Sequence, residues 1–375
     1  MTSFDPTRLR PLPLALSLTP PLALPLALLL ALGACGRDDG ARSPAAEEAG
    51  PAAGRVTPAA GEEGAADGEQ EAPAGAFALD PELAPYQTTS GVAGTLGSVG
   101  SDTLNNLMTL WAEGFNALYP NVRVQIEGKG SSTAPPALIA GTAQLGPMSR
   151  PMKAQERDDF DKRYGYAPTE VRVALDALAV YVHRDNPLSR LTLPQVDAIF
   201  SKTRACGYPG DVSTWRAAGV EGPLSGRQIS LYGRNSASGT YGFFKDHALC
   251  GGDYKDAVKE QPGSASVVQG VAEDGSAIGY SGIGYRTSGV KAVKLAADDA
   301  APAYGVSQEE VYSGDYPLAR YLYVYVNKPP NEPLDPLVRE LLAYVLSRQG
   351  QEAVIKDGYV PLTAQVAEQQ RAALR

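Results

Sequence analysis

A polar loop between a predicted strand and a predicted helix organises this chain, and it reads Arg234-Asn235-Ser236-Ala237-Ser238-Gly239-Thr240. The apolar alternation of residues 228–232 predicts the strand, and residues 240–249 are expected to form the helix. Free backbone N–H groups and hydroxyls at a helix start favour a bound anion, and Arg234 adds a forked, charged donor. A simple helix cap would use the same residues, so this loop alone leaves both interpretations open.

Three more polar loops precede predicted helices earlier in the chain. Residues 97–103 open an amphipathic helix, for which Ser101, Asp102 or Thr103 is the candidate N-cap. Residues 127–133 follow an alternating strand, and residues 145–151 precede a charged helix. Because the carboxyl ends of strands in an α/β sheet meet at one edge, we expect these loops to share a site with the loop at Arg234.

Together the loops resemble the ligand loops of phosphate-binding proteins of ABC uptake systems. The resemblance rests on Gly100-Ser101-Asp102-Thr103-Leu104, Gly128-Lys129-Gly130-Ser131-Ser132, Met148-Ser149-Arg150-Pro151 and the loop from Arg234, with similar segments at 262–268 and 278–280. It covers roughly residues 91–360, in the family's order. It implies an α/β type II periplasmic-binding-protein fold: two α/β lobes, a two-crossing hinge and a ligand cleft between the lobes.

The resemblance also implies how the chain is divided. Lobe 1 is expected from residues 86–180 and 286–375, and lobe 2 from residues 181–285. A long strand at 170–183 is expected to cross between the lobes, and strands at 277–280 and 290–295 are expected to lead back to lobe 1. One amphipathic helix is expected over 334–355.

The family's ligand positions, transferred to this sequence, define the expected site. The resemblance implies that inorganic phosphate is bound by hydroxyls, amides and arginine at Ser101, Asp102, Thr103, Ser131, Ser132, Ser149, Arg150, Arg234, Ser238, Gly239 and Thr240. Ser264 or Ser266, at the start of a further predicted helix, is an additional candidate for a contact with the ligand.

One position departs from the family pattern. Many members carry an Asp after the serine of the third loop, where it accepts the proton of hydrogen phosphate and so excludes sulfate. Arg150 occupies that place here, and Asp102 is the obvious candidate for the proton acceptor in these loops. If Asp102 instead caps its helix, the preference for phosphate over sulfate is in doubt.

The N-terminus has the features of a secretory signal. Arg8 and Arg10 precede an apolar run that ends at Leu32-Gly33-Ala34-Cys35. This ending resembles a bacterial lipobox, so residues 1–34 are expected to be a lipoprotein signal peptide and Cys35 the lipidated residue. A transmembrane anchor is the alternative, and the prolines within the run weigh against it.

Residues 35–85 are expected to be a disordered acidic linker rich in Ala, Gly, Pro and Glu. Eleven acidic residues against three arginines give residues 36–85 a charge of −8, which leaves about −2 of the total −9 for residues 86–375. The folded part is therefore nearly neutral, and no basic block indicates nucleic acid as a partner.

Cysteine usage fits an oxidising compartment. With Cys35 lipidated, Cys206 and Cys250 remain as an even pair, and we expect a disulfide between them. Two separate buried thiols are the alternative.

Several chemistries find no support in the sequence. The only histidines, His183 and His247, lie far apart and lack partners at metal-ligand spacing, so neither zinc nor a serine–histidine triad is expected. Ser288 and Lys291 match a Ser-x-x-Lys spacing, but a glycine and a strand-like continuation favour coincidence. No cofactor is expected.

The sequence thus predicts a monomeric periplasmic or cell-surface lipoprotein that is not an enzyme. It would capture inorganic phosphate for an ABC permease in the inner membrane. A receptor or sensor for another tetrahedral oxyanion and a phosphatase that uses the same anion-binding loops are the alternatives.

Overall fold

One long strand, β4 (Thr169–His183), forms the centre of the structure, a computed structural model that describes residues 77–374. Its residues 173–182 are all buried, and Asp176 is the only charged side chain among them. A nearly continuous apolar run of this kind is typical of a strand covered on both faces, and the predicted strand at 170–183 is confirmed. The signal peptide, Cys35 and most of the predicted linker lie outside the described residues.

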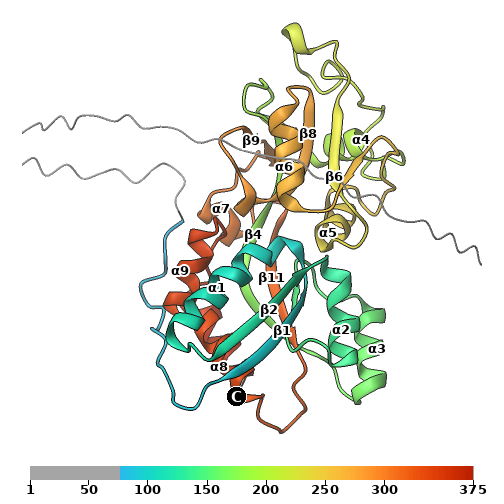
Figure 1. Cartoon of the computed structure of the whole chain (residues 1–375). Coiled ribbons are helices and arrows are strands. Elements are labelled where there is room, and N and C mark those ends of the chain that lie inside the picture. Colours follow the sequence, from blue (N-terminus) through green and yellow to red (C-terminus); the bar gives the residue numbers. More distant parts are fainter. Residues whose placement is uncertain (1–76, 375) are drawn as a thin grey trace, which may run out of the picture. The chain divides into compact units, whose positions relative to one another are not determined.

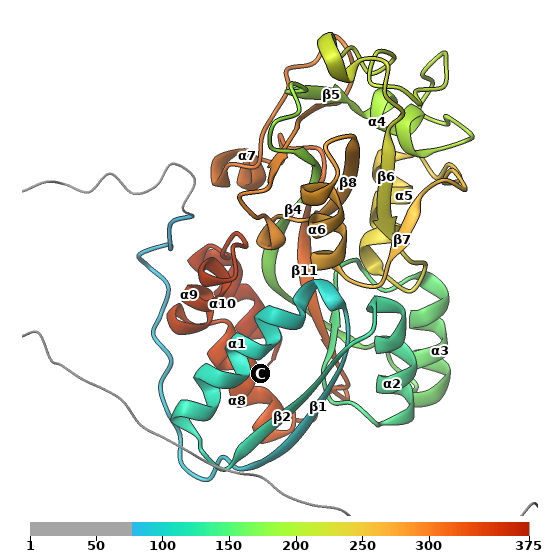
Figure 2. The same ribbon diagram turned by 45° about the horizontal axis from the view of Figure 1, so that its top comes forward.

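The central sheet is shared by two groups of elements, because β4 has different partners along its length. The N-terminal half of β4 pairs antiparallel with β11 (Ala319–Val326), and its C-terminal half pairs with β8 (Ala277–Gly282). The strand order is β3-β11-β4-β8-β6-β7, with β9 also on β4. Figures 1 and 2 show helices packed on either side of these strands, in two groups that β4 and β11 connect. We call the group around β11 lobe 1 and the group around β8 lobe 2.

Lobe 1 contains elements from both ends of the described chain. The parallel pair β1–β2 is followed by β3, and α1 packs against α8 and α9. The elements are β1 (Gly94–Gly100), α1 (Asn105–Leu118), β2 (Val122–Gly128), α2 (Ala134–Ala140), β3 (Gly146–Met148), α3 (Ala154–Tyr164), α8 (Pro336–Val345), α9 (Arg348–Lys356) and α10 (Ala364–Ala373), with short 3-10 turns η1 (Asp102–Leu104) and η2 (Ser131–Thr133).

Lobe 2 is built around the parallel strands β6 and β8. Its elements are β5 (Arg190–Thr192), α4 (Leu193–Phe200), η3 (Gly222–Leu224), β6 (Ser230–Arg234), α5 (Gly239–Ala248), β7 (Lys259–Gln261), α6 (Ser264–Glu273), η4 (Ile283–Tyr285), β9 (Val290–Ala292) and β10 (Lys294–Ala296). The helix α7 (Gln308–Ser313) lies between β10 and β11 in the chain.

Two expectations differ from the structure. The strands expected at 277–280 and 290–295 do not lead back to lobe 1. β8 pairs with β6 and with the C-terminal half of β4, β9 pairs with the end of β4, and β10 pairs with β5. We therefore propose that the chain returns from lobe 2 to lobe 1 after β10, within residues 297–318. We propose the other lobe boundaries as the sequence predicted them. The helix expected over 334–355 is two helices, because the Ser347 side chain caps a new start, accepting from Gly350 N at 3.3 Å.

The last residues of the predicted linker pack on lobe 1. Leu83 is buried, Asp80 Oδ2 accepts from Ala364 N at 2.8 Å, and Arg348 N donates to Ala84 O at 2.9 Å. Residues 77–85 are therefore held to lobe 1 by a buried leucine and by hydrogen bonds, and the prediction of a disordered linker was wrong for them.

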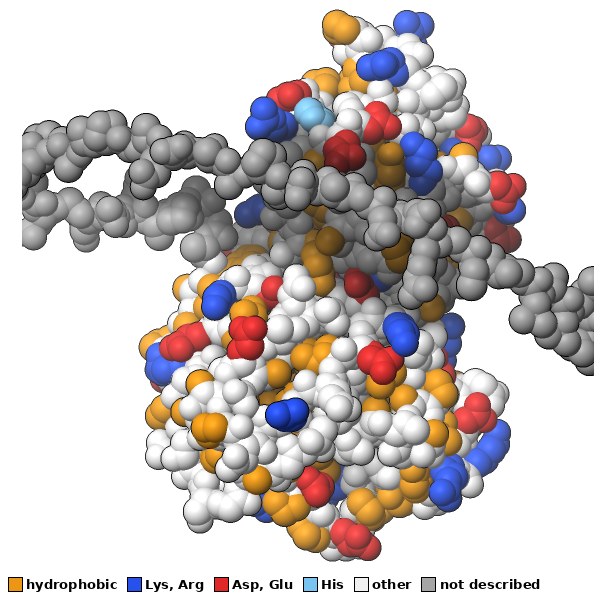
Figure 3. Space-filling model, in the orientation of Figure 1, with side chains coloured by type: hydrophobic (Ala, Val, Ile, Leu, Met, Phe, Trp, Pro, Cys, Tyr) orange, Lys and Arg blue, Asp and Glu red, His pale blue; other side chains and the backbone are white. Residues whose placement is uncertain are grey.

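The surface is mixed in charge. On the face drawn in Figure 3, acidic and basic side chains of the described residues are interspersed. None of the helices between residues 77 and 374 has the length and hydrophobicity needed to span a membrane.

Candidate anion site

The predicted loops of lobe 1 meet at the ends of β1, β2 and β3. Ser101 N donates to Pro147 O at 2.8 Å, and Gly130 N donates to Gly100 O at 2.8 Å, so backbone hydrogen bonds join the three loops edge to edge. This is the arrangement expected where polar loops follow neighbouring strands of one sheet.

Four hydroxyls from these loops and from α5 form a buried cluster, which we call the hydroxyl cluster: Thr103, Ser131, Ser149 and Thr240. The Thr103 and Thr240 Oγ1 atoms are 2.9 Å apart, and Ser149 Oγ lies 3.3 Å from Ser131 Oγ and 3.4 Å from Thr240 Oγ1. Each side chain is at most 1% exposed. Hydroxyls can rotate their hydrogens toward a new acceptor, so the cluster can present several donors to one anion.

The start of α5 packs directly against lobe 1. A Cβ atom built on Gly239 would lie 2.7 Å from Ser149 Oγ and would also overlap Ser131 Oγ. Ser132 N donates to Ala237 O at 3.1 Å across the same boundary. Only glycine permits this approach, which places the amino end of α5 against the hydroxyl cluster.

Ser238 has the role of a helix cap. Its Oγ accepts from Thr240 N at 3.1 Å and from Tyr241 N at 3.4 Å. The cap interpretation of the opening loop therefore holds for Ser238, while Thr240 of the same loop belongs to the hydroxyl cluster.

Arg234 lies at the end of β6 with 1% of its surface exposed. Its Nη1 donates to Ser264 Oγ at 2.6 Å, and its Nη2 donates to Pro262 O at 3.3 Å and lies 3.2 Å from Asp102 Oδ2. Burial lowers the pKa of the guanidinium, and the Asp102 carboxylate opposes that shift. Its buried Nε has no hydrogen-bond partner among residues 77–374.

Asp102 does not cap its own helix. Its Oδ2 accepts from Ser264 N at 2.8 Å, at the start of α6 in lobe 2, and also faces Arg234. Within the described part of the chain, Oδ1 receives no hydrogen bond, and the side chain is 22% exposed. A carboxylate oxygen is thus left available beside the two lobes.

Arg150 and Ser132 hydrogen-bond to each other, and among the described residues neither side chain hydrogen-bonds to the hydroxyl cluster. Both terminal nitrogens of Arg150 donate to Glu156 at 2.7 Å, and Nη2 also donates to Ser132 Oγ at 3.3 Å. Because the Glu156 carboxylate occupies the guanidinium fork, Arg150 is paired within lobe 1.

Two functional candidates were missed by the sequence reasoning. Arg320 on β11 donates through Nη2 to Thr240 Oγ1 at 2.9 Å, and Asp176 on β4 accepts from the same guanidinium. The available signal was a lone carboxylate inside an otherwise apolar strand, since such a buried charge requires a partner. Among the described residues, no group of His, Cys, Asp and Glu side chains is suited to hold a metal ion.

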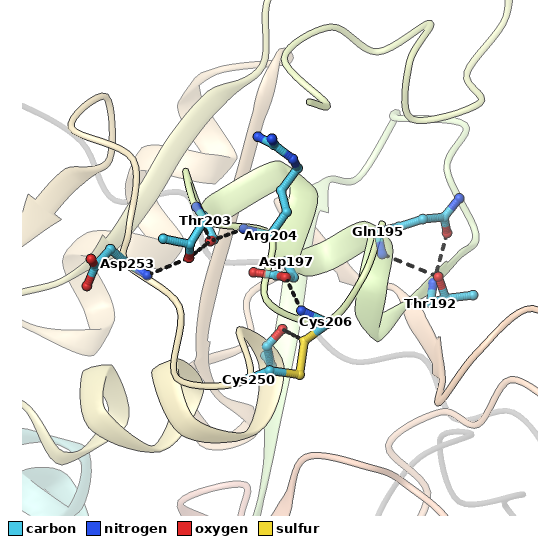
Figure 4. The surroundings of a disulfide bond; sticks show 10 residues. Thr192, Gln195, Asp197, Thr203, Arg204, Cys206, Cys250 and Asp253 are labelled. Atoms are coloured by element: carbon cyan, nitrogen blue, oxygen red, sulfur yellow. Dashed lines mark hydrogen bonds between the residues drawn. A yellow bond between two sulfur atoms is a disulfide. The ribbon is translucent and has the colours of Figure 1, made fainter. Parts of the chain in front are cut away.

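A disulfide fixes the other end of α5. Cys206 and Cys250 are bonded, as predicted, with Cα atoms 5.4 Å apart and a sequence separation of 44. Figure 4 shows the pair beside Asp197, whose carboxylate accepts from Cys206 N at 2.7 Å. Since Cys250 lies two residues after the end of α5, the bond ties this helix to the loop after α4.

The fold and the site between its lobes define a type II periplasmic-binding protein. A family model described as a PBP superfamily domain matches residues 85–349. A phosphate-binding protein PstS from Pseudomonas aeruginosa is 58% identical over 291 residues, 78% of this chain and 90% of that protein. A phosphate-binding protein PstS from Bacillus subtilis is 26% identical, over 72% of this chain and 82% of its own length. The chain belongs to the PBP superfamily and, within it, to the family of PstS phosphate-binding proteins.

Solved structures agree with this assignment. A candidate phosphate ABC transporter substrate-binding protein from Clostridium perfringens, solved with bound phosphate, superposes with a TM-score of 0.60 at 25% identity, over 72% of this chain and all of that one. An ABC-type phosphate transport receptor from Vibrio cholerae shares the fold, with a TM-score of 0.54 at 21% identity, over 71% of this chain and all of that one.

Proposed function

We propose that this protein binds inorganic phosphate reversibly between its lobes and delivers it to an ABC permease. The observation that carries the proposal is the hydroxyl cluster, in which three loops of lobe 1 and the first turn of α5 bring four buried hydroxyls within 3.4 Å of a neighbour. The names of the related proteins support phosphate as the ligand.

The donors available suit a tetrahedral oxyanion. Thr103, Ser131, Ser149 and Thr240 each offer an O–H, and the amino end of α5 adds backbone N–H groups and a favourable dipole. Arg234 brings a fixed positive charge to the same side of the cleft. We propose that Ser101, Ser238 and Gly239 shape this site through the backbone, and that Ser132 and Arg150 act only indirectly.

Asp102 is the proposed source of selectivity for phosphate over sulfate. One of its oxygens is held by Ser264 N and Arg234, and the other is available to accept a ligand proton. Hydrogen phosphate carries such a proton at neutral pH, whereas sulfate would place unprotonated oxygen against the carboxylate.

We propose binding without turnover. The cluster hydroxyls hydrogen-bond to one another, to the Ser149 N–H and to the Arg320 guanidinium, and neither of the last two is a base. An activated serine nucleophile needs a base or a metal beside it. A lack of p-nitrophenol release from p-nitrophenyl phosphate would agree with this proposal.

The location and the remaining partners are also proposals. Cys35 would carry the lipid after removal of residues 1–34, and the acidic linker would separate the membrane from a monomeric binding domain outside the cytoplasm. Metabolic labelling with a radioactive fatty acid, lost in Cys35→Ser, would test the anchor.

Calorimetric titration of the protein with inorganic phosphate and with sulfate tests the function itself. We expect 1:1 phosphate binding at micromolar or lower concentration and much weaker sulfate binding. Absence of phosphate binding at micromolar concentrations would overturn the proposal.

A further inference from the structure

A second arginine lies against the hydroxyl cluster, and it comes from the strands that connect the lobes. Arg320 on β11 stands directly opposite Asp176 on β4 in the register of the antiparallel pair. Arg320 is 5% exposed and Asp176 is fully buried. A buried charge pair costs desolvation, so its position beside a polar site calls for a functional explanation.

Asp176 holds the guanidinium in one orientation. Its Oδ2 accepts from Arg320 Nε at 3.0 Å and from Nη2 at 2.7 Å, and its Oδ1 accepts from Ile283 N at 2.9 Å. Both carboxylate oxygens are therefore occupied, which leaves Asp176 unsuited to accept a ligand proton and suited to positioning Arg320.

The free end of Arg320 contacts both lobes. Nη1 donates to Ser149 O in lobe 1 at 2.9 Å, and Nη2 donates to Thr240 Oγ1 in lobe 2 at 2.9 Å. Of the five N–H groups of an arginine, one on Nη1 has no partner within residues 77–374. Thr240 Oγ1 also lies 2.9 Å from Thr103 Oγ1, so the guanidinium reaches the hydroxyl cluster directly.

The two arginines differ in how their charge is placed. Arg234 directs its terminal nitrogens to Ser264, Pro262 and Asp102, none of which belongs to the hydroxyl cluster. Arg320 directs a terminal nitrogen at Thr240 Oγ1, a hydroxyl that belongs to the hydroxyl cluster. An oxyanion is a much stronger acceptor than a hydroxyl, so an anion that replaces Thr240 as acceptor would gain a charge-assisted hydrogen bond.

We propose that Arg320 binds the anion directly as the second arginine of the site and that Asp176 positions it. This inference rests on the proposed phosphate function. It adds a phosphate-binding side chain from the connecting strands to the phosphate-binding side chains of the two lobes. Bound phosphate would then contact lobe 1, lobe 2 and the strand pair between them.

The test compares phosphate binding by the wild-type protein and by the double variant Arg320→Gln/Asp176→Asn. The double variant removes both charges, so it leaves no buried carboxylate unpaired. We expect the calorimetric Kd for inorganic phosphate to rise on the order of 10- to 100-fold, as for loss of a charged hydrogen bond. The phosphate-dependent rise in Tm should shrink accordingly, a readout that a purely structural role would not change.

Arg172→Gln is the matched control. Arg172 is an exposed arginine on β4, where it stacks on Tyr321. Its loss removes one positive charge away from the hydroxyl cluster, whereas the double variant leaves the net charge unchanged. Its Kd should stay within about twofold of the wild-type value.

Two results would separate the possible failures. If the wild-type protein and the double variant bind phosphate equally well, the role of Arg320 is overturned and the proposed function stands. If the wild-type protein binds no phosphate, the proposed function and this inference are both overturned. If the double variant does not fold, Arg320→Lys keeps the charge but loses the fork, and a wild-type Kd for that variant would equally refute the assignment.

Discussion

At the scale of single residues, Asp102 combines two roles that usually fall to different side chains. It belongs to lobe 1, yet its Oδ2 accepts from Ser264 N and faces Arg234, both in lobe 2. The same carboxylate thus links the lobes and leaves Oδ1 available at the site. With Arg150 paired to Glu156, Asp102 is the residue on which discrimination between anions should depend.

Asp102→Asn should reduce the preference for phosphate over sulfate at least about tenfold, because an amide can donate to a fully ionised anion. Paired calorimetric titrations with the two anions give the ratio of affinities. Asp256→Asn, an exposed carboxylate on lobe 2, serves as the control. An unchanged ratio in Asp102→Asn would remove Asp102 from the role of proton acceptor.

Gly239→Ala should weaken phosphate binding roughly 10- to 100-fold with little change in Tm. The added methyl group would meet Ser149 Oγ at 2.7 Å, and the overlap can be relieved by moving α5 away from lobe 1. Gly275→Ala, where a Cβ meets nothing within 4 Å, is the control. Tight binding by Gly239→Ala would show that the close approach of α5 is dispensable.

At the scale of elements, α5 is held at both ends by different means. Its first turn packs against the hydroxyl cluster through Gly239, and its C-terminal end is joined to the loop after α4 by Cys206–Cys250. A helix fixed in this way keeps its amino end directed at the site.

Cys206→Ser/Cys250→Ser should lower the free energy of unfolding by about 4 kcal/mol, the chain-entropy estimate for a loop of this length. Urea unfolding of the variant and of reduced wild-type protein should give the same loss. A variant as stable as the oxidised protein would contradict this expectation.

The elements themselves were largely predictable, and their partners were not. The buried run of β4 and the face of α1 follow from local periodicity. The break at Ser347 escaped prediction because the apolar spacing continues across it, and the pairing of β9 with β4 depends on residues far away in sequence. In the site, the loops were predictable from hydroxyls at strand ends, whereas Arg320 lies on an apolar strand that sequence alone assigns to the core.

At the scale of the whole molecule, the site draws on every part of the binding domain. Ser131 and Ser149 come from lobe 1, Thr240 from lobe 2, and Arg320 from the strands between them. A ligand bound there would contact both lobes and the strands that connect them, and a ligand that contacts two lobes at once favours the arrangement in which both can reach it.

The pairing of β3 with β11 also has a consequence for the order of folding. Met148 pairs with Tyr323, and α1 packs on α8 and α9, so lobe 1 cannot be completed until the C-terminal part of the chain is available. Most of the β6–β8 sheet, in contrast, lies within one continuous stretch of sequence. During synthesis, lobe 1 therefore leaves the edge of β3 exposed for longer, and an exposed edge invites pairing with other chains. The yield of correctly folded protein should therefore depend on whether the edge of β3 is kept from pairing with other chains until β11 is available.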